Sequence, residues 1–186
     1  VIDPYEGVAG YPPLQVRAHA VFCSHGHFDH NAVDCVTLLP KRESPFTVRE
    51  VHTFHDDRGG ALRGGNTIRI FTAGGVSAAH LGDLGHQLTA DQLRAIGPVD
   101  AALVPVGGVY TIDAAGAKAV CDALNPACVV PMHYHQAPYG LPELAEAEAF
   151  LKLWPEKAVH RLNGPSFELT KETSGVIVPE FDGNAT

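Results

Sequence analysis

The stretch Ser24-His25-Gly26-His27-Phe28-Asp29-His30-Asn31 places three histidines and an aspartate within six positions. It follows the apolar run 18–23, which is typical of a strand, so the polar residues are expected in a loop at a strand end. Imidazole and carboxylate groups hold zinc, manganese or iron in proteins. A solvated loop would explain one histidine, but four potential ligands in H-x-H-x-D-H order predict a metal site.

Three further candidate ligands lie downstream, each where an apolar segment gives way to a polar or glycine-rich turn. His55 ends the strand-like run 46–55, Asp83 ends the run 76–83, and His133 follows the apolar segment 128–132. Strand ends on a shared rim bring together side chains that are distant in sequence. The three residues are therefore expected to complete a two-metal site.

These motifs resemble those of the metallo-β-lactamase-fold hydrolases, and within them the ascorbate-6-phosphate lactonase-like branch. The resemblance extends over most of the chain, through residues 24–31, 53–57, 79–86, 105–113 and 131–134. The first motif is specific to the superfamily, and the others together point to the branch. The fold that the resemblance implies is α/β (α+β), a four-layer αββα sandwich with metals at one edge.

The resemblance also implies how the ligands are shared between two metal ions. One ion would be held by His25, His27 and His55, and the other by Asp29, His30 and His133. Asp83 would bridge the ions together with a water or hydroxide. All seven positions carry the expected residue types, so we expect an intact binuclear site.

The chemistry of such a site favours hydrolysis. A bound metal lowers the pKa of water from 15.7 to roughly 7, so a bridging hydroxide is available at neutral pH. Asp29 is expected to orient the attacking water as well as bind metal, and Tyr134, beside His133, to stabilise a developing oxyanion. The nitrogen and oxygen ligands suit zinc first, then manganese, with iron also compatible.

Other histidines carry weaker signals. Spacing alone does not separate His52 from His55, and the resemblance favours His55 as the ligand. His80 is expected either to orient a ligand or to be a satisfied core residue. His86 and His135 are expected mainly in exposed loops, although they lie near the proposed ligands.

The glycine-rich segment 56–66 is expected to form a loop beside the site that can swing over a cleft. Arg58 or Arg63 could hold a substrate carboxylate or phosphate there, and a hairpin with solvated charges is the equal alternative. Tyr110 is a further candidate for contact with the substrate.

Length and composition agree with one soluble, enzyme-like domain over residues 1–186, which the resemblance makes a hydrolase domain. Apolar residues make up 45% of the chain, and no apolar run is long enough to cross a membrane. Lys and Arg number 13 against 21 Asp and Glu, a net charge of −8, so a nucleic-acid partner is not expected. Four cysteines without a C-x-x-C pair fit a reduced, cytoplasmic protein.

The chain start resembles the interior of a family member, and an N-terminal hairpin is expected to be missing. Val1-Ile2-Asp3-Pro4 reads as a strand entering an Asp-Pro turn. Without the hairpin one sheet would expose an edge, which would favour pairing with another chain, so a homo-oligomer is compatible with the sequence.

Alternating strands and helices are expected in the second half. Thr89 caps a helix that ends at Gly97-Pro98, a strand covers 101–104, and Asp113 caps a helix to about Leu124. A strand over 127–130 leads to His133, a helix covers 142–153, and a short strand pair near Val159 and Phe167 closes the chain. Such alternation is typical of a sheet covered by helices.

The sequence thus predicts a binuclear metal-dependent hydrolase of a small ester, lactone or related carbonyl substrate. The substrate is expected to be anionic, because two divalent ions outweigh the charge of two aspartates and a hydroxide. The alternatives are a phosphodiesterase or nuclease of the same superfamily, a diiron redox protein, and a non-catalytic metal-binding protein.

Overall fold

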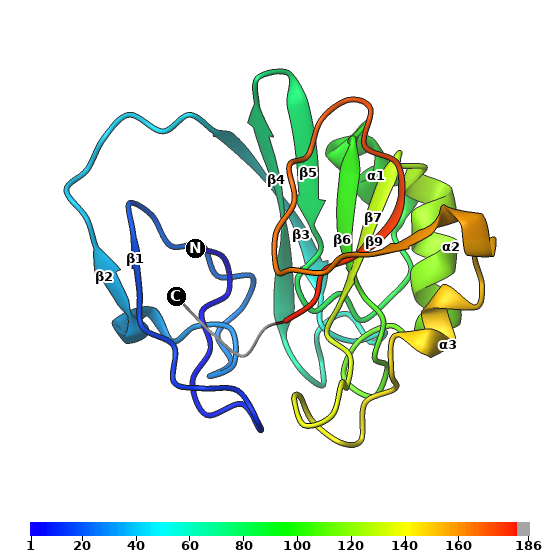
Figure 1. Ribbon diagram of the computed structural model, residues 1–186, viewed down its shortest axis with the longest axis horizontal. Coiled ribbons are helices and arrows are strands. Elements are labelled where there is room, and N and C mark those ends of the chain that lie inside the picture. Colours follow the sequence, from blue (N-terminus) through cyan, green and yellow to red (C-terminus); the bar gives the residue numbers. More distant parts are fainter. Residues whose placement is uncertain (182–186) are drawn as a thin grey trace.

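Two sheets and one layer of helices make up the computed structural model, which describes residues 1–181 (Figure 1). The strands are β1 (Val16–Ala18), β2 (Val36–Leu38), β3 (Thr47–Phe54), β4 (Gly65–Ala73), β5 (Val76–His80), β6 (Ala101–Pro105), β7 (Cys128–Met132), β8 (Val159–Arg161) and β9 (Gly175–Val178). The helices are α1 (Ala90–Ile96), α2 (Ala114–Leu124) and α3 (Glu148–Leu151), with 3₁₀ turns at Val33–Cys35 and Glu156–Ala158. None of the described helices is long and apolar enough to cross a membrane.

The large sheet has seven strands in the order β3-β4-β5-β6-β7-β9-β8. Strand β4 is antiparallel to both neighbours, whereas β5, β6, β7, β9 and β8 pair in parallel. Consequently β3, β5 and β7 all run in the same direction. The residues that follow these three strands therefore emerge at one edge of the sheet.

Helices α1, α2 and α3 cover one face of this sheet, and the N-terminal segment with β1 and β2 lies on its other side (Figure 1). The main core lies between sheet and helices and includes fully buried Ile68, Ile70, Val104, Val120 and Phe150. Burial of a side chain of this size contributes about 1.5–3 kcal/mol. The core thus fixes the strands whose ends carry the candidate ligands.

The expected mixed α/β class is confirmed, and the described residues contain fewer helices than the full four-layer sandwich that the resemblance implies. Among the described residues, the second sheet consists of the parallel pair β1 and β2. Only the 3₁₀ turn Val33–Cys35 provides helical structure in the N-terminal third. The strand expected over 18–23 is reduced to a bridge between Ile2 and Phe22.

Local signals predicted several elements correctly. Thr89 accepts a hydrogen bond from the Gln92 N–H and Gln92 caps in return, which starts α1 as expected. Asp113 caps α2, and Asn125 ends it in the left-handed conformation. The strands leading to His55, Asp83 and His133 are also present.

Two predictions about the last third were wrong. The expected helix over 142–153 is limited to Glu148–Leu151, because Ala145 instead pairs its backbone with Gly107 and His135. Of the expected closing pair, the strand near Val159 is present as β8, whereas no strand lies near Phe167 in the described chain; the partner of β8 is β9, which also pairs with β7. In both cases a distant backbone partner decides the local structure.

Candidate metal centre

Seven side chains converge at the edge where β3, β5 and β7 end. His55, Asp83 and His133 follow these strands, and the loop 25–30 provides the other candidates. The seven residues are His25, His27, Asp29, His30, His55, Asp83 and His133. The structure therefore brings together every metal ligand that the sequence predicts.

The potential ligand atoms form two groups of three. Those of His25, His27 and His55 lie within 4.8 Å of one another, and so do those of Asp29, His30 and His133. These are the two sets that the family resemblance implies. A third group, which contains His25, His30 and Asp83, overlaps both sets.

Asp83 lies at the centre of the cluster. Its Oδ2 is 3.2 Å from His55 Nε2 and 3.3 Å from His133 Nε2, and its Oδ1 is 3.3 Å from His30 Nε2. His25 Nε2 is 3.9 Å from Oδ2. One carboxylate thus faces histidines from both groups, the arrangement required of a bridging ligand.

Unpartnered buried atoms provide a test of whether a metal fits. His25 Nε2 and Asp83 Oδ1 are buried without a hydrogen-bond partner among the described residues, as are the Nδ1 atoms of His55 and His133. A buried polar atom without a partner destabilises the fold by about 1–3 kcal/mol. Because these atoms belong to a nitrogen and oxygen donor set, divalent metal ions fit the site.

The protonation states also suit metal ligands. Burial, with a contribution from neighbouring His30, lowers the pKa of His25 to about 4, so its imidazole is neutral at pH 7. Although burial opposes ionisation of Asp83, hydrogen bonds from His133 and His55 hold its pKa well below the usual range. Neutral imidazole and ionised carboxylate are the forms that bind metal.

Gly82 and Asn66 set the position of Asp83. Gly82 has φ of +55°, and a Cβ there would lie 2.3 Å from Asn66 Oδ1 and 2.5 Å from Ser24 Cβ. Buried Asn66 accepts a hydrogen bond from the Asp83 N–H and donates to Leu81 O. A larger residue at 82 would therefore displace the central carboxylate.

Asp3 supports the site and was missed in the sequence. His30 Nδ1 lies 3.0 Å from its Oδ2, and Ser24 donates its N–H and its hydroxyl to the same carboxylate at 2.6 and 2.7 Å. A carboxylate of this kind fixes the ring of a ligating histidine. The signal was present, since Asp3 follows an apolar pair as Asp83 follows β5, but it was interpreted as a turn.

The remaining histidines have different surroundings. His80 Nδ1 accepts a hydrogen bond from the Gly82 N–H and lies 4.0 Å from Asp3 Oδ2, and burial lowers the pKa of His80. His86 Nε2 accepts the Phe54 N–H and thus holds a strand end. His52 is exposed on β3, outside the cluster.

The predicted substrate residues Arg63 and Tyr110 contact each other beside the site. The Arg63 guanidinium lies 5.6 Å from the centre of the Tyr110 ring and donates a hydrogen bond to Val109 O. The Tyr110 hydroxyl donates to Glu143 at 2.7 Å. Arg58 is exposed, and the described hydrogen bonds and ion pairs do not involve its side chain.

The loop expected to swing over the cleft is closed on Asp56. The buried Asp56 carboxylate accepts backbone N–H groups of Arg58, Gly60, Leu62 and Arg63 at 2.8–2.9 Å. Burial raises the pKa of Asp56, but these four donors outweigh burial and lower that pKa to about 2. The loop thus has a fixed internal structure, which places Arg63 beside Tyr110.

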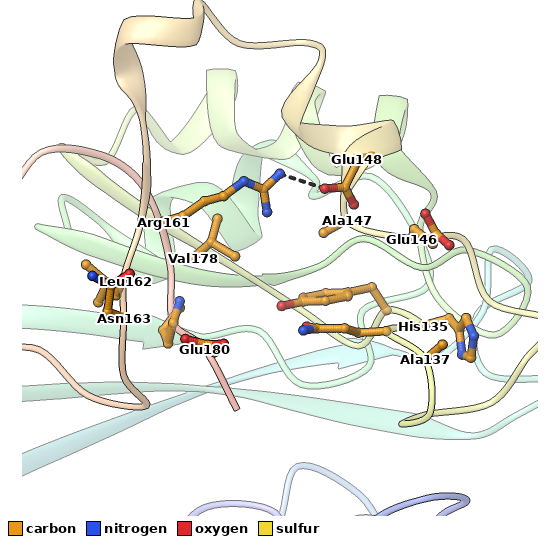
Figure 2. Close-up of a pocket in the computed structure, with 13 residues that line it drawn as sticks. His135, Ala137, Glu146, Ala147, Glu148, Arg161, Leu162, Asn163, Val178 and Glu180 are labelled. Carbon is orange, nitrogen blue, oxygen red and sulfur yellow. Dashed lines mark hydrogen bonds and ion pairs between the residues drawn. The ribbon is translucent and has the colours of Figure 1, made fainter. Parts of the chain in front are cut away.

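A cavity of about 450 Å³ opens beside the cluster, and Asp29, His30, Asp83 and His133 line it. A second cavity of about 490 Å³ is bordered by Glu148 and Arg161, which form an ion pair at 2.6 Å (Figure 2). The second cavity contains none of the seven ligands among its described lining residues. Convergence of ligands identifies the first cavity as the candidate active site.

Tyr134 lines both cavities. Burial, together with the charge of Glu148, raises the pKa of its phenol, and Arg161 opposes the increase. Both charges belong to the second cavity. No described hydrogen bond joins the Tyr134 hydroxyl to the ligand cluster, so the role of Tyr134 as an oxyanion stabiliser stays a prediction. His135 also borders the second cavity, where its Nδ1 is buried without a described partner.

The fold and the site define a metal-dependent hydrolase of the metallo-β-lactamase type. The family model described as "Beta-lactamase superfamily domain" matches residues 1–133. A UPF0173 metal-dependent hydrolase of Carboxydothermus hydrogenoformans is 34% identical over 78% of this chain and 81% of its own length. The chain therefore belongs to the UPF0173 metal-dependent hydrolases of the β-lactamase superfamily.

Two further relatives agree. A UPF0173 metal-dependent hydrolase of Thermococcus kodakarensis is 28% identical over 91% of this chain and 90% of its own length. A crystal structure from Thermotoga maritima, assigned as a Zn-dependent hydrolase of the metallo-β-lactamase superfamily, superposes with a TM-score of 0.73. The two sequences are 34% identical, and the match covers 95% of this chain and 87% of that protein. These similarities do not distinguish the lactonase-like branch, which stays a prediction.

Proposed function

We propose that this protein is a binuclear hydrolase that cleaves a small ester, lactone or related carbonyl compound. The observation that carries the proposal is the pair of three-ligand groups with Asp83 between them. His25, His27 and His55 would hold one ion, Asp29, His30 and His133 the other, and Asp83 both. Zinc is the first candidate and manganese the second.

The ions, when bound, would supply an activated water at neutral pH and a Lewis acid for the carbonyl oxygen. The chain's own residues would orient the reaction. Asp29 lines the cavity and its side chain is 23% exposed, so one carboxylate oxygen can accept a hydrogen bond from water. His80 lines the same cavity and lies 4.0 Å from Asp3 Oδ2, so it would help to hold the carboxylate that supports His30.

Elemental analysis of protein purified without added metal tests the binuclear site. We expect about two equivalents of zinc or manganese per chain, and about one in either His27→Ala or His133→Ala, since these residues belong to different groups. The matched control is His19→Ala, because His19 is exposed and outside the cluster. One equivalent or none in the reconstituted wild type would contradict the proposal, and two of iron would favour redox chemistry.

Turnover separates the proposed activity from its relatives. The same preparations would be assayed with a lactone, a carboxylic ester and a phosphodiester. We expect hydrolysis of the carbonyl substrates to fall to background in both ligand variants and to be unchanged in His19→Ala. Faster turnover of the phosphodiester would instead support the phosphodiesterase alternative. Absence of turnover with all three substrates would support a metal-binding protein without catalysis.

A further inference from the structure

The cavity beside the metal centre has apolar walls away from the ligands. The N-terminal segment contributes Ile2, Val8 and Tyr11, and the segment after His133 contributes Leu141 and Leu144. The strand that delivers His133 adds Val130, Pro131 and Met132 to the lining. Any group that leaves the metal edge therefore enters an aliphatic and aromatic environment.

Tyr5, Tyr11 and Phe181 line the cavity and belong to a cluster of aromatic rings that also includes Tyr139. The Tyr11 ring centre lies 5.4 Å from that of Tyr5, 5.1 Å from Tyr139 and 5.0 Å from Phe181. The Tyr5 hydroxyl donates to Pro12 O within its own segment. Because the rings pack against one another at normal distances, they form a preorganised apolar surface.

Phe28 is a further aromatic residue of the cavity lining. It lies between the candidate ligands His27 and Asp29, lines the cavity, and is 67% exposed. A phenylalanine so exposed gains nothing from burial in the folded chain. An apolar group bound next to the metal ions would cover it.

The charged residues of the lining all belong to the metal edge. They are Asp3, Asp29 and Asp83, and none of the described lining residues is a lysine or arginine. Arg63, the nearest predicted anion partner, instead contacts Val109 O and Tyr110 outside this lining. The remaining side-chain donors of the lining are uncharged, among them Gln136 and the tyrosine hydroxyls, so a carboxylate or phosphate moved from water into these walls would lose its hydration without gaining a cationic partner.

We propose that the substrate carries an uncharged, apolar acyl chain or ring, which occupies this cavity while its ester or lactone group faces the metal centre. The proposal rests on the proposed hydrolase function, since the metal edge defines which end of the substrate reacts. It replaces the anionic substrate expected from the charge of the ions alone. That charge acts on the reacting carbonyl, whereas the walls select the rest of the molecule.

Calorimetric titration of the zinc-loaded protein tests the walls without turnover. The ligands are acetohydroxamate, hexanohydroxamate and adipic monohydroxamate, which share one metal-binding group and differ in chain length and terminal charge. Each methylene that enters the cavity should raise affinity about fourfold, and the terminal carboxylate of the adipic compound should remove this gain. Equal or tighter binding of the adipic compound would overturn the proposal.

Substitutions in the wall check where the chain binds. Leu141→Arg, with Val8→Arg as a second variant in case one does not fold, should raise the affinity for adipic monohydroxamate about tenfold and weaken hexanohydroxamate. Leu153→Arg is the matched control, because Leu153 is 45% exposed and outside the cavity. Unchanged affinities in both folded wall variants would place the chain elsewhere and contradict the proposal.

The outcomes separate this proposal from the function on which it rests. If the protein binds neither zinc nor manganese, the proposed function fails. A comparison of hexan-1-ol with 6-hydroxyhexanoate as ligands of the metal-free protein still tests the walls. The chain-length preference without hydrolysis of any ester or lactone would support the walls and contradict the hydrolase. Hydrolysis with a preference for ω-carboxylated esters would support the hydrolase and overturn the apolar substrate.

Discussion

Two carboxylates at opposite edges of the seven-stranded sheet, one where the strands end and one where they begin, have different surroundings. At the edge where β3, β5 and β7 end, Asp83 faces four histidines, and its Oδ1 is buried without a hydrogen bond. At the other edge, Asp100 precedes β6 and accepts hydrogen bonds from Ser77 N–H at 2.8 Å and from Lys171 at 2.7 and 2.8 Å.

The difference shows what distinguishes a functional carboxylate from a structural one. Asp100 has all its partners within the chain, so its charge stabilises the fold by itself. Asp83 and its histidines include buried atoms without a hydrogen-bond partner among the described residues, which is costly unless the metal ions that we propose contact them. Substitution of Asp83 should therefore change metal content and turnover, whereas substitution of Asp100 should change the stability of the fold.

The largest effect is expected for Asp83→Ala. Removal of the carboxylate that faces both ligand groups should abolish binding of both metals and reduce turnover by at least about 10³-fold. Elemental analysis and a kcat measurement test this, with Asp100→Asn as the control that keeps its metal. Full metal content in Asp83→Ala would show that the carboxylate does not bridge.

A smaller loss is expected for Asp29→Asn, which keeps the shape of the side chain but weakens it as a hydrogen-bond acceptor for water. Turnover should fall about 10²-fold, while KM and the melting temperature change little because the side chain is partly exposed. Full kcat in this variant would contradict the orienting role. The comparison requires equal metal content in both proteins, measured on the same samples.

Much of this site could be predicted from the sequence, because each ligand follows a strand signal that is local. The runs before His55 and Asp83 form β3 and β5, and the short apolar segment before His133 forms β7. Parallel strands place such ends at one edge. Caps at Thr89 and Asp113 are equally local.

The features that escaped prediction depend on distant partners. Ala145 pairs with Gly107 and His135 where a helix was expected, and β9 forms by pairing with β7 and β8. Asp3 becomes a support only through the bridge between Ile2 and Phe22, which brings it to Ser24. Neither periodicity nor propensity contains these contacts.

Asp3→Asn should weaken metal binding without abolishing it. Loss of the charge that holds His30 Nδ1 should reduce metal affinity about 10–100-fold, whereas kcat at saturating metal stays close to the wild-type value. Competition against a chromophoric chelator measures the affinity. The neighbouring exposed residue provides the control Glu6→Gln, which should bind metal as the wild type does. An unchanged affinity in Asp3→Asn would reduce Asp3 to a turn residue.

The smallest effect is expected at the opposite edge, in the stability of Asp100→Asn. Hydrogen bonds from Lys171 and from the Ser77 backbone lower the pKa of Asp100 below its ordinary 3.8. Because the folded pKa lies below the unfolded one, the charge stabilises the fold above pH 3.8 and ceases to do so as the pH falls through the folded pKa. The pair is partly exposed, so we expect a loss of about 0.5–1 kcal/mol at pH 7.

Urea unfolding of Asp100→Asn and wild type at pH 7 and at successively lower pH values below 3.8 measures this loss, and the two proteins should converge as the pH falls through the folded pKa of Asp100. Lys171→Met should reproduce the neutral-pH deficit, since it removes the same pair. A deficit that persists in acid would arise from the hydrogen bonds to Ser77 rather than from charge. Unchanged metal content in Asp100→Asn is required as well, because a loss there would mean that the two edges are not independent.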